Sequence, residues 1–155
     1  MTPEELRKDG RNPQAGKMVR AGTISTNEIL PLLGSGKIMV LGKLVKSSSL
    51  RLRCFKENGI TCKVCGRTGE FFAVEKHIKS VNDSHHLNLY AVDPDGVEVL
   101  ITHDHIVPLS RGGADSFHNT QTMCAPCNLE KGCSTISQET QPDPSQSKNL
   151  GKLPS

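Results

Sequence analysis

The sequence predicts a small α+β domain that depends on cross-links as well as on its apolar core. The chain has 155 residues, of which 35% are hydrophobic and 3% aromatic, so the core that it can build is small. Six cysteines are present, and four of them form two Cys-x-x-Cys pairs. Short domains with thin cores often need disulfides or a bound metal to be stable on their own. Between the two pairs, short strand-like apolar runs precede a helical segment, which gives the mixed class.

Three segments differ in composition. Residues 1–45 form a short N-terminal extension, residues 46–136 the folded domain, and residues 137–155 a disordered tail, because the tail carries only Leu150 and Leu153 as large apolar groups. The N-terminus lacks the apolar run of a secretory signal, and no stretch of about 18 apolar residues predicts a membrane span. We therefore expect a cytoplasmic protein with no membrane partner.

The extension contains two helix starts and one apolar run. Thr2 begins a short helix with capping-box spacing, and Ser25 with Glu28 repeats that box more clearly. Pro31 limits the second helix to about two turns. The apolar run 37–45 is compatible with one strand.

The folded domain is expected to begin and end with a helix. Ser47–Ser49 offer N-caps for the first helix, and Gly59 suits the position just after its end. Asp93–Gly96 is a turn between two strands. The expected elements are helix 50–58, strands 71–74, 87–92 and 97–101, loop 108–118 and helix 126–136.

The two cysteine pairs predict a structural zinc site. Two Cys-x-x-Cys turns can close a four-thiolate shell around zinc, and such a shell leaves no open position for chemistry. The alternatives are a redox pair, which would need a βαβ pattern that the sequence lacks, or disulfides, which a reducing setting disfavours. The expected zinc ligands are Cys62, Cys65, Cys124 and Cys127, whereas Cys54 and Cys133 lack partners at ligand spacing.

A second group of residues has the composition of a hydrolytic metal site. Asp104 offers a hard oxygen ligand beside His105, whose imidazole can accept a proton from water near neutral pH. Asn128, on the last predicted helix, offers a second oxygen. Mg²⁺ is commonly held by one or two protein oxygens together with water and phosphate oxygens. The pattern therefore predicts a one-metal phosphodiesterase site.

The stretch DHIVPLSRGG…N…C..CN..KG resembles the HNH nucleases, and the likeness spans about residues 62–132. The resemblance implies a ββα-metal fold, in which a β-hairpin and a helix surround one catalytic Mg²⁺ or Mn²⁺. By position, His105 would be the general base, Asp104 and Asn128 would be metal ligands, and Asn119 would pin the loop and orient His105. Lys131 is expected to contact phosphate.

The order of residues in the strand raises one difficulty. In a regular strand, His103 and His105 share one face and Asp104 lies on the other. For Asp104 and His105 to reach the same site, the strand must end or twist there. Otherwise His103 is the alternative to Asp104 as a ligand.

The charge distribution points to an anionic partner. The net charge is only +3, but residues 43–79 hold nine Lys or Arg against three Glu, and a local surplus of this kind suits phosphates. Within the helix 50–58, Arg51, Arg53 and Lys56 are expected to contact DNA, and residues 1–45 are a further candidate for DNA contact.

The resemblance implies a metal-dependent DNA endonuclease that leaves 5′-phosphate and 3′-hydroxyl ends. The alternative is a zinc-dependent nucleic-acid-binding module without cleavage activity. A third reading is a protein that cuts only within a complex. Short family members of this kind resemble phage or mobile-element enzymes, so the expected setting is a bacterial or phage-infected cytoplasm, with a homodimer or a phage packaging partner as possible assemblies.

Overall fold

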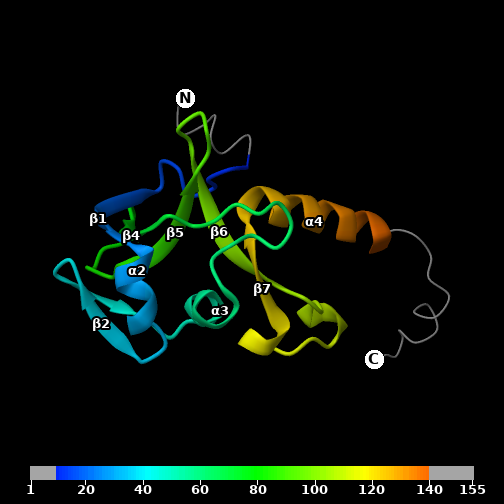
Figure 1. Cartoon of the computed structure of the whole chain (residues 1–155), viewed down its shortest axis with the longest axis horizontal. Coiled ribbons are helices and arrows are strands. Elements are labelled where there is room, and N and C mark those ends of the chain that lie inside the picture. Colours follow the sequence, from blue (N-terminus) through cyan, green and yellow to red (C-terminus); the bar gives the residue numbers. More distant parts are fainter. Residues whose placement is uncertain (1–9, 140–155) are drawn as a thin grey trace.

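The computed structural model describes residues 10–139, with side chains as far as Gly132. The chain mixes helices with strands, as predicted, and its last strand runs directly into its last helix (Figure 1). The predicted helix at Thr2 and most of the predicted disordered tail lie outside the described residues. The strands, α-helices and 3₁₀ helices (η) are β1 Met18–Ser25, α2 Thr26–Ile29, η1 Leu30–Leu32, β2 Lys37–Val40, β3 Lys43–Lys46, α3 Leu50–Asn58, β4 Phe71–His77, β5 His86–Val92, β6 Glu98–His105, η2 Leu109–Arg111, η3 Phe117–Asn119, β7 Thr120–Cys124 and α4 Ala125–Glu139.

Five strands form one antiparallel sheet in the order β1-β4-β5-β6-β7. β1, which the sequence analysis did not predict, pairs with β4 from Met18 opposite His77 to Ser25 opposite Phe71. Part of the segment assigned above to the N-terminal extension therefore joins the large sheet through β1, and its Ile29, Leu33, Val40 and Val45 join the core. The alternation of β1 is weak because most of its side chains are exposed at the edge of the sheet.

The prediction of one strand over residues 37–45 was wrong. The segment forms a hairpin, β2 paired with β3, as a second sheet. Leu41 and Gly42 make the turn with φ of 50° and 77°, a left-handed conformation that glycine adopts without steric cost. A Cβ added to Gly22 would lie 2.8 Å from the Leu41 side chain, so the hairpin tip packs closely on β1.

The helix caps agree with the sequence. The Ser25 hydroxyl accepts a hydrogen bond from the backbone N–H of Glu28, and the Ser49 hydroxyl accepts one from that of Leu52. Gly59 follows α3 with φ of 96°. A serine cap contributes about 1 kcal/mol to helix stability, which matters for helices as short as these.

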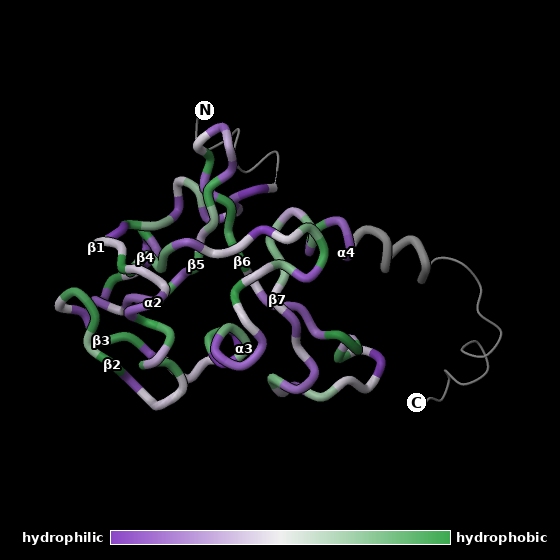
Figure 2. Tube along the Cα trace, in the orientation of Figure 1, coloured by the Kyte–Doolittle hydropathy of each residue, from purple (hydrophilic) through white to green (hydrophobic). Residues whose placement is uncertain are grey.

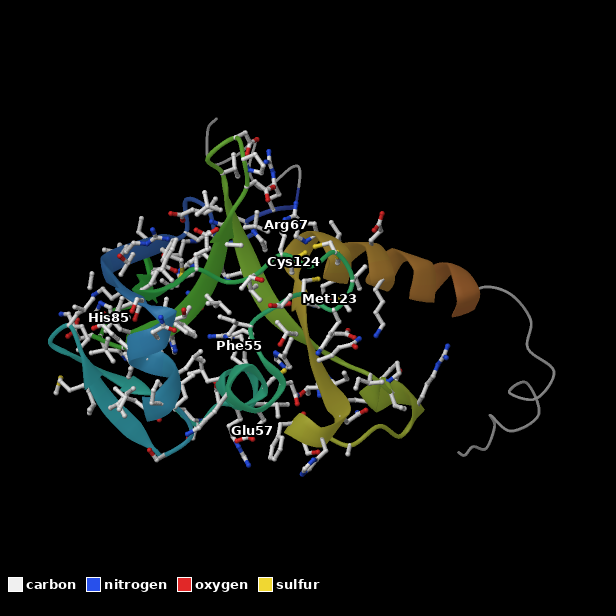
Figure 3. The ribbon with its side chains drawn as sticks, in the orientation of Figure 1. Phe55, Glu57, Arg67, His85, Met123 and Cys124 are labelled. Carbon is white, nitrogen blue, oxygen red and sulfur yellow. The ribbon has the colours of Figure 1, made fainter. Side chains whose placement is uncertain are left out.

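Apolar residues pack on both faces of the large sheet. On one face, α3 and the β2–β3 hairpin bury Phe55, Phe72 and Val45 in the larger cluster, and Phe55 points inward from α3 in Figure 3. On the other face, Tyr90 and Leu100 form a smaller cluster with neighbours that include Ala125 at the start of α4. Burying a side chain such as Phe72 stabilises the fold by roughly 1.5–3 kcal/mol.

The sheet divides where β5 and β6 separate. Their pairing runs from Val92 opposite Glu98 to Leu89 opposite Ile101 and no further. Beyond Ile101, β6 continues with β7 as its partner as far as His105, and Figure 1 shows the two pairs of strands diverging on either side of α3. The diverging end of β6 carries the polar residues of the candidate site.

Candidate functional site

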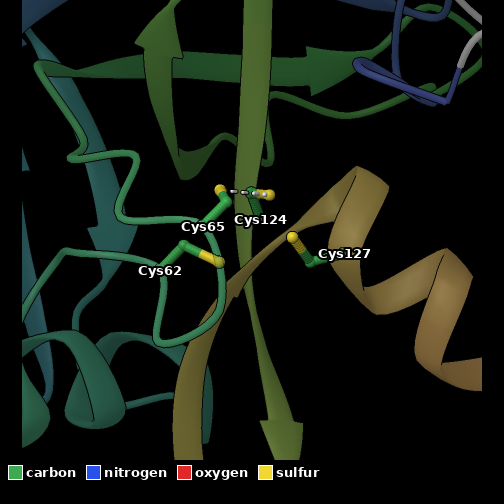
Figure 4. A group of neighbouring side chains, drawn as sticks. All are labelled: Cys62, Cys65, Cys124 and Cys127. Carbon is green, nitrogen blue, oxygen red and sulfur yellow. Dashed lines mark hydrogen bonds between the residues drawn. The ribbon is translucent and has the colours of Figure 1, made fainter.

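Four cysteine sulfurs come together from three elements. Cys62 and Cys65 lie in the loop after α3, Cys124 ends β7, and Cys127 lies in the first turn of α4 (Figure 4). Their sulfur atoms all lie within 4.8 Å of one another, and those of Cys65 and Cys124 are 3.6 Å apart. All four thiols are free, and the set could hold a metal ion such as zinc.

The thiols of this cluster differ in acidity, because the pKa of Cys62 is lowered whereas burial raises the pKa of Cys124 and of Cys127. Burial acts to raise the pKa of the Cys62 thiol, but hydrogen bonds from backbone N–H groups, led by those of Cys65 and Cys124, outweigh it and bring the pKa to about 6. Burial raises the pKa of the Cys127 thiol. In a zinc site all four sulfurs would be thiolates, because the metal displaces their protons.

Arg67 is a neighbour of the cluster that the sequence analysis missed. One guanidinium nitrogen lies 3.3 Å from the Cys124 sulfur, while Nε and Nη2 donate to the Asp93 carboxylate at 2.9 and 3.0 Å; Figure 3 labels Arg67 close to Cys124. A cationic donor beside sulfur offsets the negative charge of a four-thiolate shell. No spacing rule links Arg67 to the turn between β5 and β6, so only the fold reveals it.

β6 stays regular through the predicted catalytic residues. Its register with β7 continues without a bulge to His105 opposite Thr120, and the rings of His103 and His105 are 5.7 Å apart between centroids. Asp104 therefore leaves the strand on the opposite face from both histidines. The register stays regular through Asp104 and the strand ends at His105, so no irregularity in the pairing brings the two side chains onto one face.

Asp104 faces α4. Its Oδ2 accepts hydrogen bonds from Lys131 and, at 3.4 Å, from Gln121. On the same side, the Asn128 amide nitrogen donates to the Thr102 hydroxyl at 3.0 Å and to the His103 carbonyl at 3.3 Å. Within the described residues, Oδ1 of Asp104 and Oδ1 of Asn128 make no hydrogen bond. Two free oxygens on one side of a strand are a donor set that fits a hard divalent cation.

His105 faces the loop between β6 and β7. Its Nε2 lies 2.9 Å from Oδ1 of Asp115, and the two side chains are 21% and 69% exposed, so the pair is open to solvent on one side. Its neighbour His103 is half-buried, and burial lowers the pKa of the His103 imidazole, with the positive charge of Arg51 acting in the same direction. Asp115 was not predicted, because the composition of residues 108–118 indicates only a loop.

Asn119 closes that loop. Its amide nitrogen donates to the carbonyls of Val107 and Ala114 at 2.9 and 2.8 Å, and its Oδ1 accepts from the Val107 N–H at 2.9 Å. A Cβ on Gly113 would collide with the Val107 carbonyl and come within 2.8 Å of the Asn119 amide nitrogen. The loop therefore has one tight conformation, and that conformation holds Asp115 against His105.

The three basic residues of α3 differ in orientation. Arg51 points inward, where its Nη2 donates to the Leu87 carbonyl at 2.9 Å and its Nε is buried without a partner in the described residues. Arg53 is exposed, with its guanidinium 4.9 Å from the centroid of the Phe117 ring. Lys56 is also exposed and donates to the Leu33 carbonyl at 2.6 Å. Only Arg53 and Lys56 are thus positioned for an external anion.

Residues 96–141 match a family model described as HNH endonuclease. The match covers β6, the Asn119 loop, β7 and α4, and it includes Cys124 and Cys127 but not the first cysteine pair. The comparison with curated proteins gave no match, and neither did the comparison with solved structures. No helix among residues 10–139 is long and apolar enough to cross a membrane.

Proposed function

We propose that this chain, which belongs to the HNH endonuclease family through its residues 96–141, is a divalent-metal-dependent nuclease that hydrolyses DNA phosphodiester bonds with His105 as general base. The observation that supports this most is the arrangement around the end of β6. His105 is held there by a carboxylate, and the free oxygens of Asp104 and Asn128 lie on the side that faces α4.

The hydrogen bond to Asp115 determines which nitrogen of His105 is basic. An ionised carboxylate only accepts hydrogen bonds, so Nε2 of His105 carries the hydrogen in this pair. The lone pair of the neutral ring is then on Nδ1, which can take the proton from an attacking water. After that transfer, the negative charge of Asp115 stabilises the imidazolium.

Asp104 and Asn128 are the residues that would hold a catalytic Mg²⁺ or Mn²⁺. A divalent cation there would supply positive charge for the phosphate and the leaving oxygen. Lys131 donates to Asp104 and, at 3.3 Å, to the His105 carbonyl, so its ammonium group also lies beside this site. We assign it to contact with a substrate phosphate.

The four-cysteine cluster would hold zinc with a structural role. It ties the loop after α3 to the junction of β7 and α4. Because β7 and α4 carry Gln121 and Asn128, a metal at this junction fixes the elements around the candidate site. A closed four-sulfur shell leaves no position for substrate.

DNA is the proposed partner, with Arg53 and Lys56 as phosphate contacts. The inward direction of Arg51 removes it from this set. The 5′-phosphate and 3′-hydroxyl ends, the homodimer, the phage packaging partner and the bacterial or phage-infected setting stay predictions.

A plasmid-nicking assay with added Mg²⁺ or Mn²⁺ tests the proposal. The zinc-loaded wild-type chain should convert supercoiled plasmid to open circles, and His105→Ala should cut about 10²–10⁴-fold more slowly. His77→Ala is the matched control, because His77 is exposed at the end of β4. Equal rates for wild type and His105→Ala would refute the assignment of the base. DNA binding without any cutting by wild type would favour the binding module.

A further inference from the structure

The outward face of the β2–β3 hairpin has an unusual composition. Lys37 lies directly opposite Lys46, and Met39 directly opposite Leu44. These four side chains point away from the buried face of the hairpin, where Val40 and Val45 join the core. Met39 and Leu44 are 64% and 53% exposed, and Figure 2 shows the hydrophobic stretches that run along this hairpin.

The lysine pair is unfavourable in the isolated chain. Like charges directly opposite one another destabilise an antiparallel pair of strands, and residues 32–46 contain no Asp or Glu. Within the described residues, the structure gives neither Lys37 nor Lys46 an acidic partner, whereas the nearby Lys43 has Asp83 at 3.1 Å. A paired cationic position beside exposed apolar groups is therefore suited to an external anion.

α3 connects this hairpin to the candidate nuclease site. Lys56 binds the Leu33 carbonyl at the base of the hairpin at 2.6 Å, and Arg53 lies over Phe117 in the loop that follows His105. Figure 1 shows α3 between the hairpin and β7. Glu57 is the acidic residue of α3, and it is exposed on the outer side of that helix (Figure 3). Basic side chains thus continue from the hairpin across α3 toward His105.

We propose that the outward face of the β2–β3 hairpin is a second DNA contact, at which Lys37 and Lys46 bind backbone phosphates and Met39 and Leu44 lie against the groove. This inference rests on the proposed function, since the DNA is the nuclease substrate extending beyond the catalytic site. A two-stranded ribbon fits the major groove, where apolar side chains contact the methyl group of thymine. The lysines give affinity and register but no sequence preference.

The test is salt-dependent binding of a labelled DNA duplex, measured by fluorescence anisotropy. The protein is the zinc-loaded full chain with His105→Ala, so that the duplex stays intact. Each phosphate contact contributes about 0.9 to the slope of log affinity against log salt. Combining Lys37→Gln with Lys46→Gln should therefore lower that slope by about 1.8. The control combines Lys17→Gln with Lys79→Gln, two exposed lysines outside the hairpin, and should lower the slope by less than the hairpin pair does.

A second variant tests the apolar contact. Met39→Ser with Leu44→Ser should weaken binding several-fold without a change in slope, because the lysines remain. Both side chains are exposed, so the fold should tolerate the change, and a thermal melt confirms that it does.

Three results would overturn the inference. An unchanged slope for the lysine variant, or an equal fall for the control pair, would place the DNA elsewhere while leaving the proposed nuclease function intact. A DNA-independent dimer in sedimentation that Met39→Ser with Leu44→Ser disrupts would make the hairpin a contact between copies of the chain. Absence of any DNA binding at low salt would count against the proposed function as well.

Discussion

Replacement of Asn119 by alanine should release the loop that faces His105. The asparagine side chain makes three hydrogen bonds to the backbone of Val107 and Ala114. It touches neither Asp104 nor Asn128 in the described contacts. The substitution therefore tests whether loop closure itself is needed for activity.

The magnitude follows from the three bonds. A hydrogen bond contributes about 0.5–1.5 kcal/mol net, and water can replace part of each because the loop is largely exposed. A total of about 1.5–3 kcal/mol is therefore expected for the closed loop. Since about 1.4 kcal/mol is a factor of ten, the ratio of closed to open loop should fall roughly 10–100-fold.

Two measurements check this together. Hydrogen exchange of the Val107 amide, which donates to Oδ1 of Asn119, should become faster by about the same factor, and plasmid nicking should slow. Asn119→Asp is a second test variant: it keeps the acceptor for the Val107 N–H but turns another acceptor toward the Val107 and Ala114 carbonyls, so it should be similarly impaired. Normal exchange and normal nicking in Asn119→Ala would refute the reasoning.

Three further outcomes are expected. Cys124→Ser should release zinc and abolish the cooperative thermal melt; a cooperative melt without bound metal would contradict a four-thiolate structural site. Asn128→Ala should keep zinc and fold but shift the Mg²⁺ or Mn²⁺ needed for half-maximal nicking upward, and an unchanged metal titration would count against its ligand role. Burial, followed by the nearby Glu75 carboxylate, raises the pKa of Tyr90, so the unfolded chain releases this proton first and the free energy of unfolding should fall as pH rises above about 10. Tyr90→Phe should remove that part of the pH dependence, as measured by urea unfolding; identical pH profiles for the two proteins would exclude it.

The parts of the fold that sequence predicted are those with local signals. Ser49 and Gly59 bracket α3 because capping depends on residues within one turn. Each Cys-x-x-Cys pair carries a local signal for a metal-binding turn, and the four sulfurs cluster as expected. The turn at Asp93 was likewise predictable, with the Asp93 N–H donating to the Val97 carbonyl at 2.9 Å.

The parts that sequence missed depend on partners far along the chain. β1 has weak alternation, and it becomes a strand because β4 offers it an edge to pair with. β7 is only five residues long and sits between a glycine-rich loop and a cysteine pair, so its own composition gives no strand signal. Arg67 and Asp93 meet through the tertiary fold alone.

The regularity of β6 changes how the proposed catalytic residues would cooperate. Asp104 and His105 were expected to reach one site through a break in the strand, yet the pairing with β7 stays regular through Asp104 and ends only at His105. The two side chains therefore approach a substrate from opposite faces of β6, at the point where that strand has parted from β5. A phosphate at the free end of the strand could be reached from both faces at once, by Nδ1 of His105 from the side of the loop and by Asp104 from the side of α4. The end of β6 would be open to such a substrate because β5 separates from it beyond Ile101. If β5 stayed paired with β6 to the end of the strand, β5 would cover the site even though the site residues were unchanged.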